Sequence, residues 1–194
     1  MDLRQEIVLV RHGETEWSRD GRHTGRTDLA LTDVGEKQGE RLSSLLAGRV
    51  FALVLTSPLQ RARRTCELAG LNGAEVVDDL RELDYGVYEG RTTTEIQREI
   101  PGWSVWTSPL AGGETLDEAG ARADRVIDRV RGTQGDVAVF GHGHMLRILG
   151  ARWCGFPATA GAHFELSTAS ISVLGFEHMT PGIRSWNKTL PPEG

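Results

Sequence analysis

Cysteine is scarce in this chain of 194 residues, and the two that occur, Cys66 and Cys154, do not form a Cys-x-x-Cys pair. We expect two buried or half-buried thiols in a reducing compartment. Long apolar runs are absent too, since no stretch approaches the ~20 residues that span a bilayer. The beginning of the chain (MDLRQEIVLV) holds two acidic side chains and only a short apolar run, unlike a signal peptide. These absences predict a cytoplasmic protein without a membrane partner.

An excess of positive charge is also missing, because the formal net charge is −5. This charge gives no reason to expect nucleic acid or an anionic membrane as a partner, although a local cluster of arginines can still bind a small anion. No G-x-S-x-G or Walker motif occurs, which argues against a serine hydrolase or a nucleotide hydrolase of those types. The length and the hydrophobic fraction of 39% suit one globular domain over residues 1–194. A homodimer is compatible with these features.

Short apolar runs alternate with segments of helical spacing along the chain. The runs predict strands at residues 6–10, 51–56, 136–140 and 170–176. The helical spacing predicts helices at residues 32–47, 58–68 and 114–130. The stretch from about residue 78 to 113 is predicted to be irregular and to cover one edge of a site. This order predicts an α/β fold, a three-layer α/β/α domain with a central, mostly parallel sheet.

Histidines stand next to glycines at the ends of two predicted strands. The first strand leads into Arg11-His12-Gly13, and the strand at 136–140 leads into Gly141-His142-Gly143-His144. The strand at 51–56 leads into an arginine-rich segment that contains Arg61. Ligands of open parallel sheets bind beyond the carboxyl ends of the strands, and guanidinium groups match phosphate oxygens. The pattern therefore indicates an anion site, most simply for phosphate.

Phosphoryl transfer needs an in-line nucleophile, positive charge around the phosphoryl oxygens and an acid for the leaving oxygen. A neutral His12 imidazole is a suitable nucleophile when its other nitrogen is held by a hydrogen bond. Arg11, Arg61 and His142 are candidates for the positive shell. Glu82 is the candidate acid, since a neighbouring phosphate dianion favours the protonated carboxyl.

These motifs together resemble the histidine phosphatase superfamily, which is also called phosphoglycerate-mutase-like. The resemblance extends from Val8 to about Gly150, and its blocks occur in the order found in the family. The blocks are RHGET (11–15), SPLQRARRT (57–65), ELDYGVYEG (82–90), GGETLDE (112–118) and GHGHMLR (141–147).

The resemblance implies a role for each matched residue. His12 corresponds to the phosphorylated histidine, and Arg11 and Arg61 to the two phosphate-binding arginines. His142 corresponds to the second histidine, which contacts the transferring phosphoryl group, and Glu82 to the proton donor. The substrate side is expected to include Ser18, His23, Thr24, Tyr88, Gly143 and His144, in addition to Arg11, Arg61 and His142. No metal or cofactor is implied.

The segment between Gly90 and Gly112 favours one branch of this family. Glycolytic mutases of the family carry a long insertion with extra basic residues there, whereas this segment is short and its only basic residues are Arg91 and Arg98. The chain thus resembles the phosphatase branch, in particular actinobacterial acid phosphatases and the fungal sedoheptulose bisphosphatase. We predict hydrolysis of small phosphomonoesters, with sugar phosphates favoured.

Three alternatives stay open from the sequence. A phosphoglycerate-type mutase would use the same phosphohistidine. A metal-dependent hydrolase would bind its ion through His12, His142 and His144, although the flanking arginines would repel a cation. The third alternative is a binding or regulatory protein on the same scaffold without catalysis.

Overall fold

Six strands form one sheet in the computed structural model of the protein, which describes residues 4–191. Their spatial order is β3-β2-β4-β1-β5-β6. The strands are β1 (Ile7–Arg11), β2 (Leu53–Thr56), β3 (Glu75–Val76), β4 (Val137–Gly141), β5 (Ile171–Glu177) and β6 (Thr180–Lys188). The pairs among β3, β2, β4 and β1 are parallel, whereas β5 and β6 are antiparallel to their neighbours. The predicted α/β fold with a mostly parallel sheet is confirmed.

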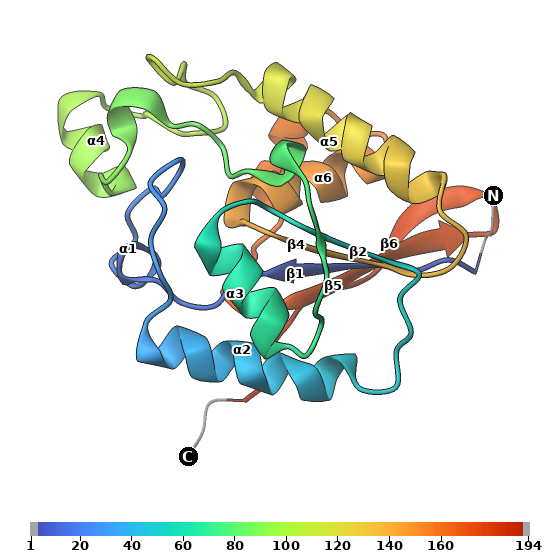
Figure 1. Ribbon diagram of the computed structural model, residues 1–194. Helices are drawn as coiled ribbons and strands as arrows, with labels where there is room; N and C mark the ends of the chain where they lie inside the picture. The colour runs from blue at the N-terminus through green and yellow to red at the C-terminus, as the bar shows by residue number, and fades with distance from the viewer. Residues whose placement is uncertain (1–3, 192–194) are drawn as a thin grey trace.

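Helices cover both faces of this sheet. They are α1 (Glu16–Arg19), α2 (Asp33–Leu46), α3 (Gln60–Leu68), α4 (Thr93–Glu99), α5 (Leu116–Arg131) and α6 (Gly143–Trp153). In Figure 1, α2 and α3 lie on one side of the sheet and α5 and α6 on the other, which gives the three layers. No helix within residues 4–191 is both long enough and apolar enough to cross a membrane.

The alternation of side chains along β1 explains the layers. Val8 and Val10 are buried in the apolar cluster that includes residues of α2 and α3, whereas Ile7 and Leu9 belong to the cluster with α5 and α6. Successive side chains of a strand point to opposite faces of the sheet. A strand covered on both faces is apolar throughout, which is why this part of the sequence is a continuous apolar run.

The predicted helix boundaries are close to the observed ones. Thr32 caps α2, because its side chain accepts a hydrogen bond from the backbone N–H of Gly35 at 3.0 Å. The helix expected from Pro58 begins at Gln60, since the chain stays extended through its cap, Leu59. No helix range was predicted for α1, α4 or α6, and α4 lies within the stretch that was expected to be irregular. Most residues of α6 are buried, so its sequence shows no clear alternation of polar and apolar faces.

Candidate active site

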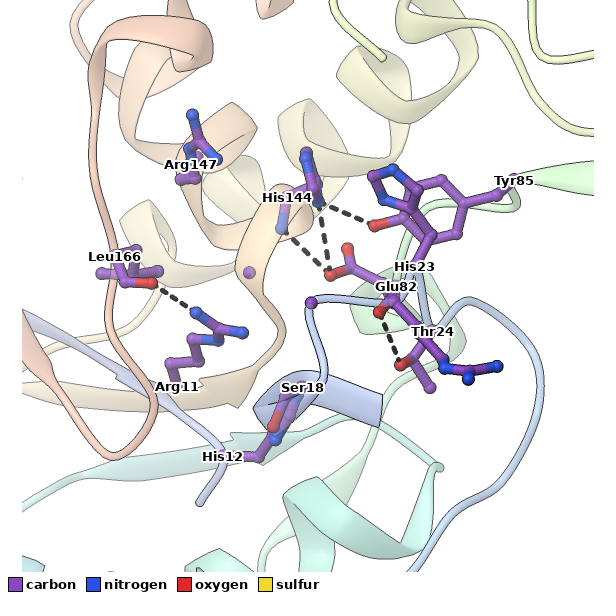
Figure 2. A pocket seen from close by; sticks show the side chains of 13 residues that line it. Arg11, His12, Ser18, His23, Thr24, Glu82, Tyr85, His144, Arg147 and Leu166 are labelled. Carbon is purple, nitrogen blue, oxygen red and sulfur yellow. Dashed lines mark hydrogen bonds and ion pairs between the residues drawn. The ribbon is translucent and has the colours of Figure 1, made fainter. Parts of the chain in front are cut away.

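A cavity of about 190 Å³ opens beyond the carboxyl ends of β1 and β4. Most of the site residues predicted from the sequence line it. They are Arg11, His12, Ser18, His23, Thr24, Glu82, Gly143 and His144. The cavity is also lined by residues that the sequence did not single out, namely Gly21, Arg22, Tyr85, Arg147 and Leu166. Figure 2 shows how the labelled side chains surround this space.

The two histidines that follow β1 and β4 lie side by side. These strands are parallel neighbours with Arg11 opposite Gly141, and the backbone N–H of His12 donates to the Gly141 carbonyl at 3.1 Å. The ring centroids of His12 and His142 are consequently 5.1 Å apart. The sheet register therefore brings together two motifs that are far apart in the chain.

The hydrogen bonds of His12 determine which ring nitrogen is available. Its Nδ1 lies 2.7 Å from the carbonyl oxygen of Gly13. Since a carbonyl can only accept, Nδ1 carries the proton and Nε2 keeps a lone pair. Burial, together with the charges of Arg61 and Arg11, holds the pKa of His12 well below its usual range. At neutral pH the ring is an uncharged imidazole with Nε2 free to attack.

Gly13 is held from two directions. A Cβ atom at this position would lie 2.4 Å from the carbonyl oxygen of Gly35 in α2, so only glycine allows this approach. On the other side, the Gly13 N–H donates to Thr65 Oγ1 at 3.0 Å, and that hydroxyl donates to the carbonyl of Arg61 at 2.7 Å. The carbonyl that orients His12 thus belongs to a residue fixed by α2 and α3.

Arg61 and His142 are completely buried and do not line the cavity. Arg61 Nε donates to His142 Nδ1 at 3.1 Å, so the His142 proton is on Nε2, which lies 2.7 Å from Ser57 Oγ. The Nη atoms of Arg61 donate to the carbonyls of Thr24, Gly25 and Thr27. In this arrangement Arg61 contributes its charge and organises the 24–27 loop, while its nitrogens bond to protein groups.

Arg11 presents positive charge directly to the cavity. One Nη donates to the Leu166 carbonyl, and Nε is buried without a hydrogen-bond partner within residues 4–191. No carboxylate of the described chain forms an ion pair with this guanidinium. A partly buried cation that forms no ion pair within the described residues is suited to an anionic ligand.

Glu82 lies at the start of α6 with its carboxylate in the cavity wall. It accepts hydrogen bonds from the backbone N–H groups of Leu83, His144 and Met145 at 2.9, 3.0 and 2.9 Å. Two of these donors are in the first turn of α6, where N–H groups have no partner inside the helix. The same carboxyl group thus caps a buried helix and faces the cavity.

An aromatic wall continues the cavity beyond Glu82. Tyr85 Oη lies 2.7 Å from His144 Nδ1, and the ring of His23 is centred 4.8 Å from that of Tyr85. Tyr88, predicted as a substrate-side residue, is not part of the wall. It is buried and packs against Trp103 at 5.0 Å. Both tyrosines belong to the ELDYGVYEG block, and the tight turn at Gly86–Tyr88 directs Tyr85 rather than Tyr88 to the cavity.

The partly buried His23 side chain should make the folded protein less stable at acidic pH. Burial lowers the pKa of His23 from 6.5 to about 4. Below about pH 6.5 the unfolded chain binds a proton on this ring that the folded protein excludes, so the free energy of unfolding falls as the pH is lowered toward 4. We expect His23→Gln to reduce the loss between about pH 7 and pH 5 by about 2 kcal/mol, measured by urea unfolding.

Comparison with known proteins agrees with this geometry. Residues 7–189 match the histidine phosphatase superfamily (branch 1). The chain is 42% identical over 176 residues to an acid phosphatase of Mycobacterium tuberculosis, covering 89% of this chain and 87% of that protein. It is 38% identical over 187 residues to sedoheptulose 1,7-bisphosphatase of Saccharomyces cerevisiae, covering 79% and 69%. A solved structure of an open reading frame from Mycobacterium tuberculosis superimposes with a TM-score of 0.92 at 39% identity, covering 96% and 98%.

The chain belongs to the histidine phosphatase superfamily. It is an enzyme, a phosphoric monoester hydrolase. Within residues 4–191, no group of three or more His, Cys, Asp or Glu side chains is placed to hold a metal ion. The metal-dependent alternative therefore has no ligand set in the described part of the chain.

Proposed function

We propose that this enzyme hydrolyses small phosphomonoesters, with sugar phosphates favoured, through a covalent phosphohistidine on His12. The observation that carries the proposal is the neutral His12 ring, whose Nδ1–H is bonded to the Gly13 carbonyl and which lines the same cavity as Arg11. An uncharged imidazole beside an unpaired guanidinium suits attack on the phosphorus of an anionic ester.

The reaction proceeds in two displacements. His12 Nε2 attacks phosphorus, the P–O bond to the alcohol breaks, and Glu82 gives its proton to the leaving oxygen. Water then attacks the phosphoryl group, Glu82 takes up a proton from that water, and the N–P bond breaks to release inorganic phosphate and neutral His12. The Gly13 carbonyl stabilises the positive charge on the ring while the phosphoryl group is attached.

The arginines and His142 have different tasks in this scheme. Arg11 binds the phosphoryl oxygens, since its guanidinium lines the cavity. Arg61 lies behind the cavity wall and contributes positive charge while it orients His142. His142, with its ring centre 5.1 Å from that of His12, donates to the phosphoryl group once its Nε2–H leaves Ser57. Ser18 and Thr24 line the cavity as further donors.

The volume and the lining of the cavity favour a small polar substrate. A volume of about 190 Å³ lies below the usual range for drug-sized ligands. Beyond the phosphate end, Tyr85, His23 and His144 offer hydroxyl and imidazole groups to a hydroxylated carbon skeleton. The names of two relatives, an acid phosphatase and a sugar bisphosphatase, point in the same direction. A cytoplasmic location and the absence of a nucleic-acid partner stay predictions from composition.

Two measurements test the proposal. Phosphate release is measured over a panel of phosphorylated sugars, amino acids and glycerates, and isomerisation of a phosphoglycerate is followed in parallel. An alkaline quench during turnover preserves a phosphohistidine, which mass spectrometry assigns to a residue. We expect phosphate release and a label on His12. Isomerisation that exceeds hydrolysis would support the mutase instead, and a label elsewhere would contradict the assignment of the nucleophile.

The proposed mechanism gives Thr65 a positioning role. Its hydroxyl holds Gly13, whose carbonyl orients His12. We expect Thr65→Val, which keeps the shape but removes the hydroxyl, to lower kcat about tenfold or more with a smaller change in KM. Thr65→Ser should recover most of the activity because the hydroxyl is restored. A purely structural role would instead lower the melting temperature while leaving kcat per folded enzyme unchanged.

A further inference from the structure

The segment 164–170, which leads into β5, contacts both reactive residues at the end of β1. The Leu166 carbonyl accepts a hydrogen bond from one Nη of Arg11, and the Ala169 N–H donates to the His12 carbonyl at 3.0 Å. Figure 2 shows the Leu166 carbonyl turned toward the Arg11 guanidinium in the cavity wall. The same short segment therefore holds the side chain of Arg11 and the backbone of His12.

The segment 164–170 belongs to no helix or strand, so no regular ladder of hydrogen bonds maintains its backbone. Ala169 is buried and has a φ of +49°, in the left-handed region that is unfavourable for a residue with a side chain. A residue keeps such a conformation only where the surrounding structure imposes it. Contacts with other parts of the chain therefore determine the path of this segment.

One peptide group of this segment connects Arg11 to the edge strand β6. Asn187 Oδ1 in β6 accepts a hydrogen bond from the Ser167 N–H at 2.7 Å. The Ser167 N–H and the Leu166 carbonyl belong to the same planar peptide group, and in a trans peptide they point in opposite directions. Because this plane is rigid, the hydrogen bond to Asn187 fixes the direction of the carbonyl that accepts from Arg11.

The preceding peptide group is held by the adjacent residue of β6. The Trp186 Nε1–H donates to the Glu165 carbonyl at 2.5 Å, and the Trp186 ring packs against Phe164 with the ring centres 5.2 Å apart. In a regular strand the side chains of Trp186 and Asn187 would point to opposite faces of the sheet. Asn187 has a φ of +56°, a left-handed conformation that asparagine tolerates, and this kink lets both side chains reach the same segment.

We propose that Trp186 and Asn187 are positioning residues, which hold the Leu166 carbonyl and thereby orient Arg11 toward the phosphate. This inference rests on the proposed function, in which Arg11 binds the phosphoryl oxygens. The guanidinium is a planar fork, so its bonds to phosphate depend on its orientation. Among the described residues its Nε has no partner, and the Leu166 carbonyl is the contact that orients its Nη groups.

Binding of inorganic phosphate, measured by calorimetry, tests this role without turnover. Trp186→Phe keeps a ring against Phe164 but removes the indole N–H, and Asn187→Gly keeps the left-handed backbone but removes the acceptor. We expect Kd for phosphate to rise about threefold or more in each variant and about tenfold or more in the double variant. Asn187→Asp, which keeps an oxygen for the Ser167 N–H, should recover most of the affinity.

Trp153→Phe is the matched structural control. The buried Trp153 indole N–H also donates to backbone carbonyls, those of Gly175 and Gly182 in β5 and β6 at 3.1 and 3.2 Å, which lie outside the segment 164–170. It should lower the melting temperature and leave Kd for phosphate unchanged. An unchanged Kd in the double variant, or an equal loss in Trp153→Phe, would overturn the positioning role. A wild-type enzyme that binds phosphate but hydrolyses no phosphomonoester would instead overturn the proposed function.

Discussion

Replacement of His12 by alanine is expected to lower kcat/KM for every phosphomonoester by roughly four orders of magnitude or more, as loss of a covalent nucleophile generally does. The neighbouring groups remain, but none is equivalently placed. His142 Nδ1 accepts from Arg61 and its Nε2 lies against Ser57, so it has no lone pair to offer. His144 Nδ1 is engaged with Tyr85. The initial rate of phosphate release, followed over hours, measures the loss.

A second variant separates chemistry from folding. His12→Asn keeps a side-chain N–H that can reach the Gly13 carbonyl, yet supplies no nucleophile. It should be as inactive as His12→Ala with a melting temperature nearer to that of the wild type. His178→Ala, at an exposed histidine, should retain full activity. Activity of His12→Asn within tenfold of the wild type would contradict the phosphohistidine mechanism.

The meeting of His12 and His142 could be predicted from the sequence because strand ends are local features. Each histidine comes two residues after the end of a buried apolar run, and parallel strands bring their carboxyl ends to one edge of the sheet. The one further requirement is that β1 and β4 are neighbours in the sheet, and they are. A glycine follows each histidine in the sequence, and this pattern also indicated a ligand site at these two strand ends.

The remainder of the cavity could not be predicted in this way. Tyr85 and Tyr88 are three residues apart in one motif, and which of them faces the ligand depends on the tight turn between them. Arg147 lies on α6, whose buried sequence has no period that assigns its faces. The hydrogen bonds of Arg61 to the 24–27 carbonyls join segments whose contact no local pattern specifies. Contacts between distant segments were missing from the prediction wherever no strand end or sequence block marked them.

Glu82→Gln is expected to divide substrates by their leaving groups. With a sugar or alkyl phosphate, the departing alkoxide needs a proton, and loss of a general acid typically costs 10²–10⁴-fold in kcat. With p-nitrophenyl phosphate, the departing phenolate is stable without protonation, so the loss should be less than about tenfold. Steady-state kcat for the two substrates gives the comparison. Glu99→Gln, at an exposed carboxylate outside the cavity, should leave both values unchanged.

The position of Glu82 at the start of α6 makes the ratio of the two losses the decisive quantity. Both oxygens accept from backbone N–H groups, and glutamine would turn its own N–H₂ toward one of these donors, at a cost of about 1–3 kcal/mol in stability. Partial unfolding or a displaced helix would lower both rates by the same factor, since each preparation is assayed with both substrates. Only loss of proton donation lowers one rate more than the other. Equal losses would therefore leave Glu82 as the cap of α6 and remove it from the chemistry.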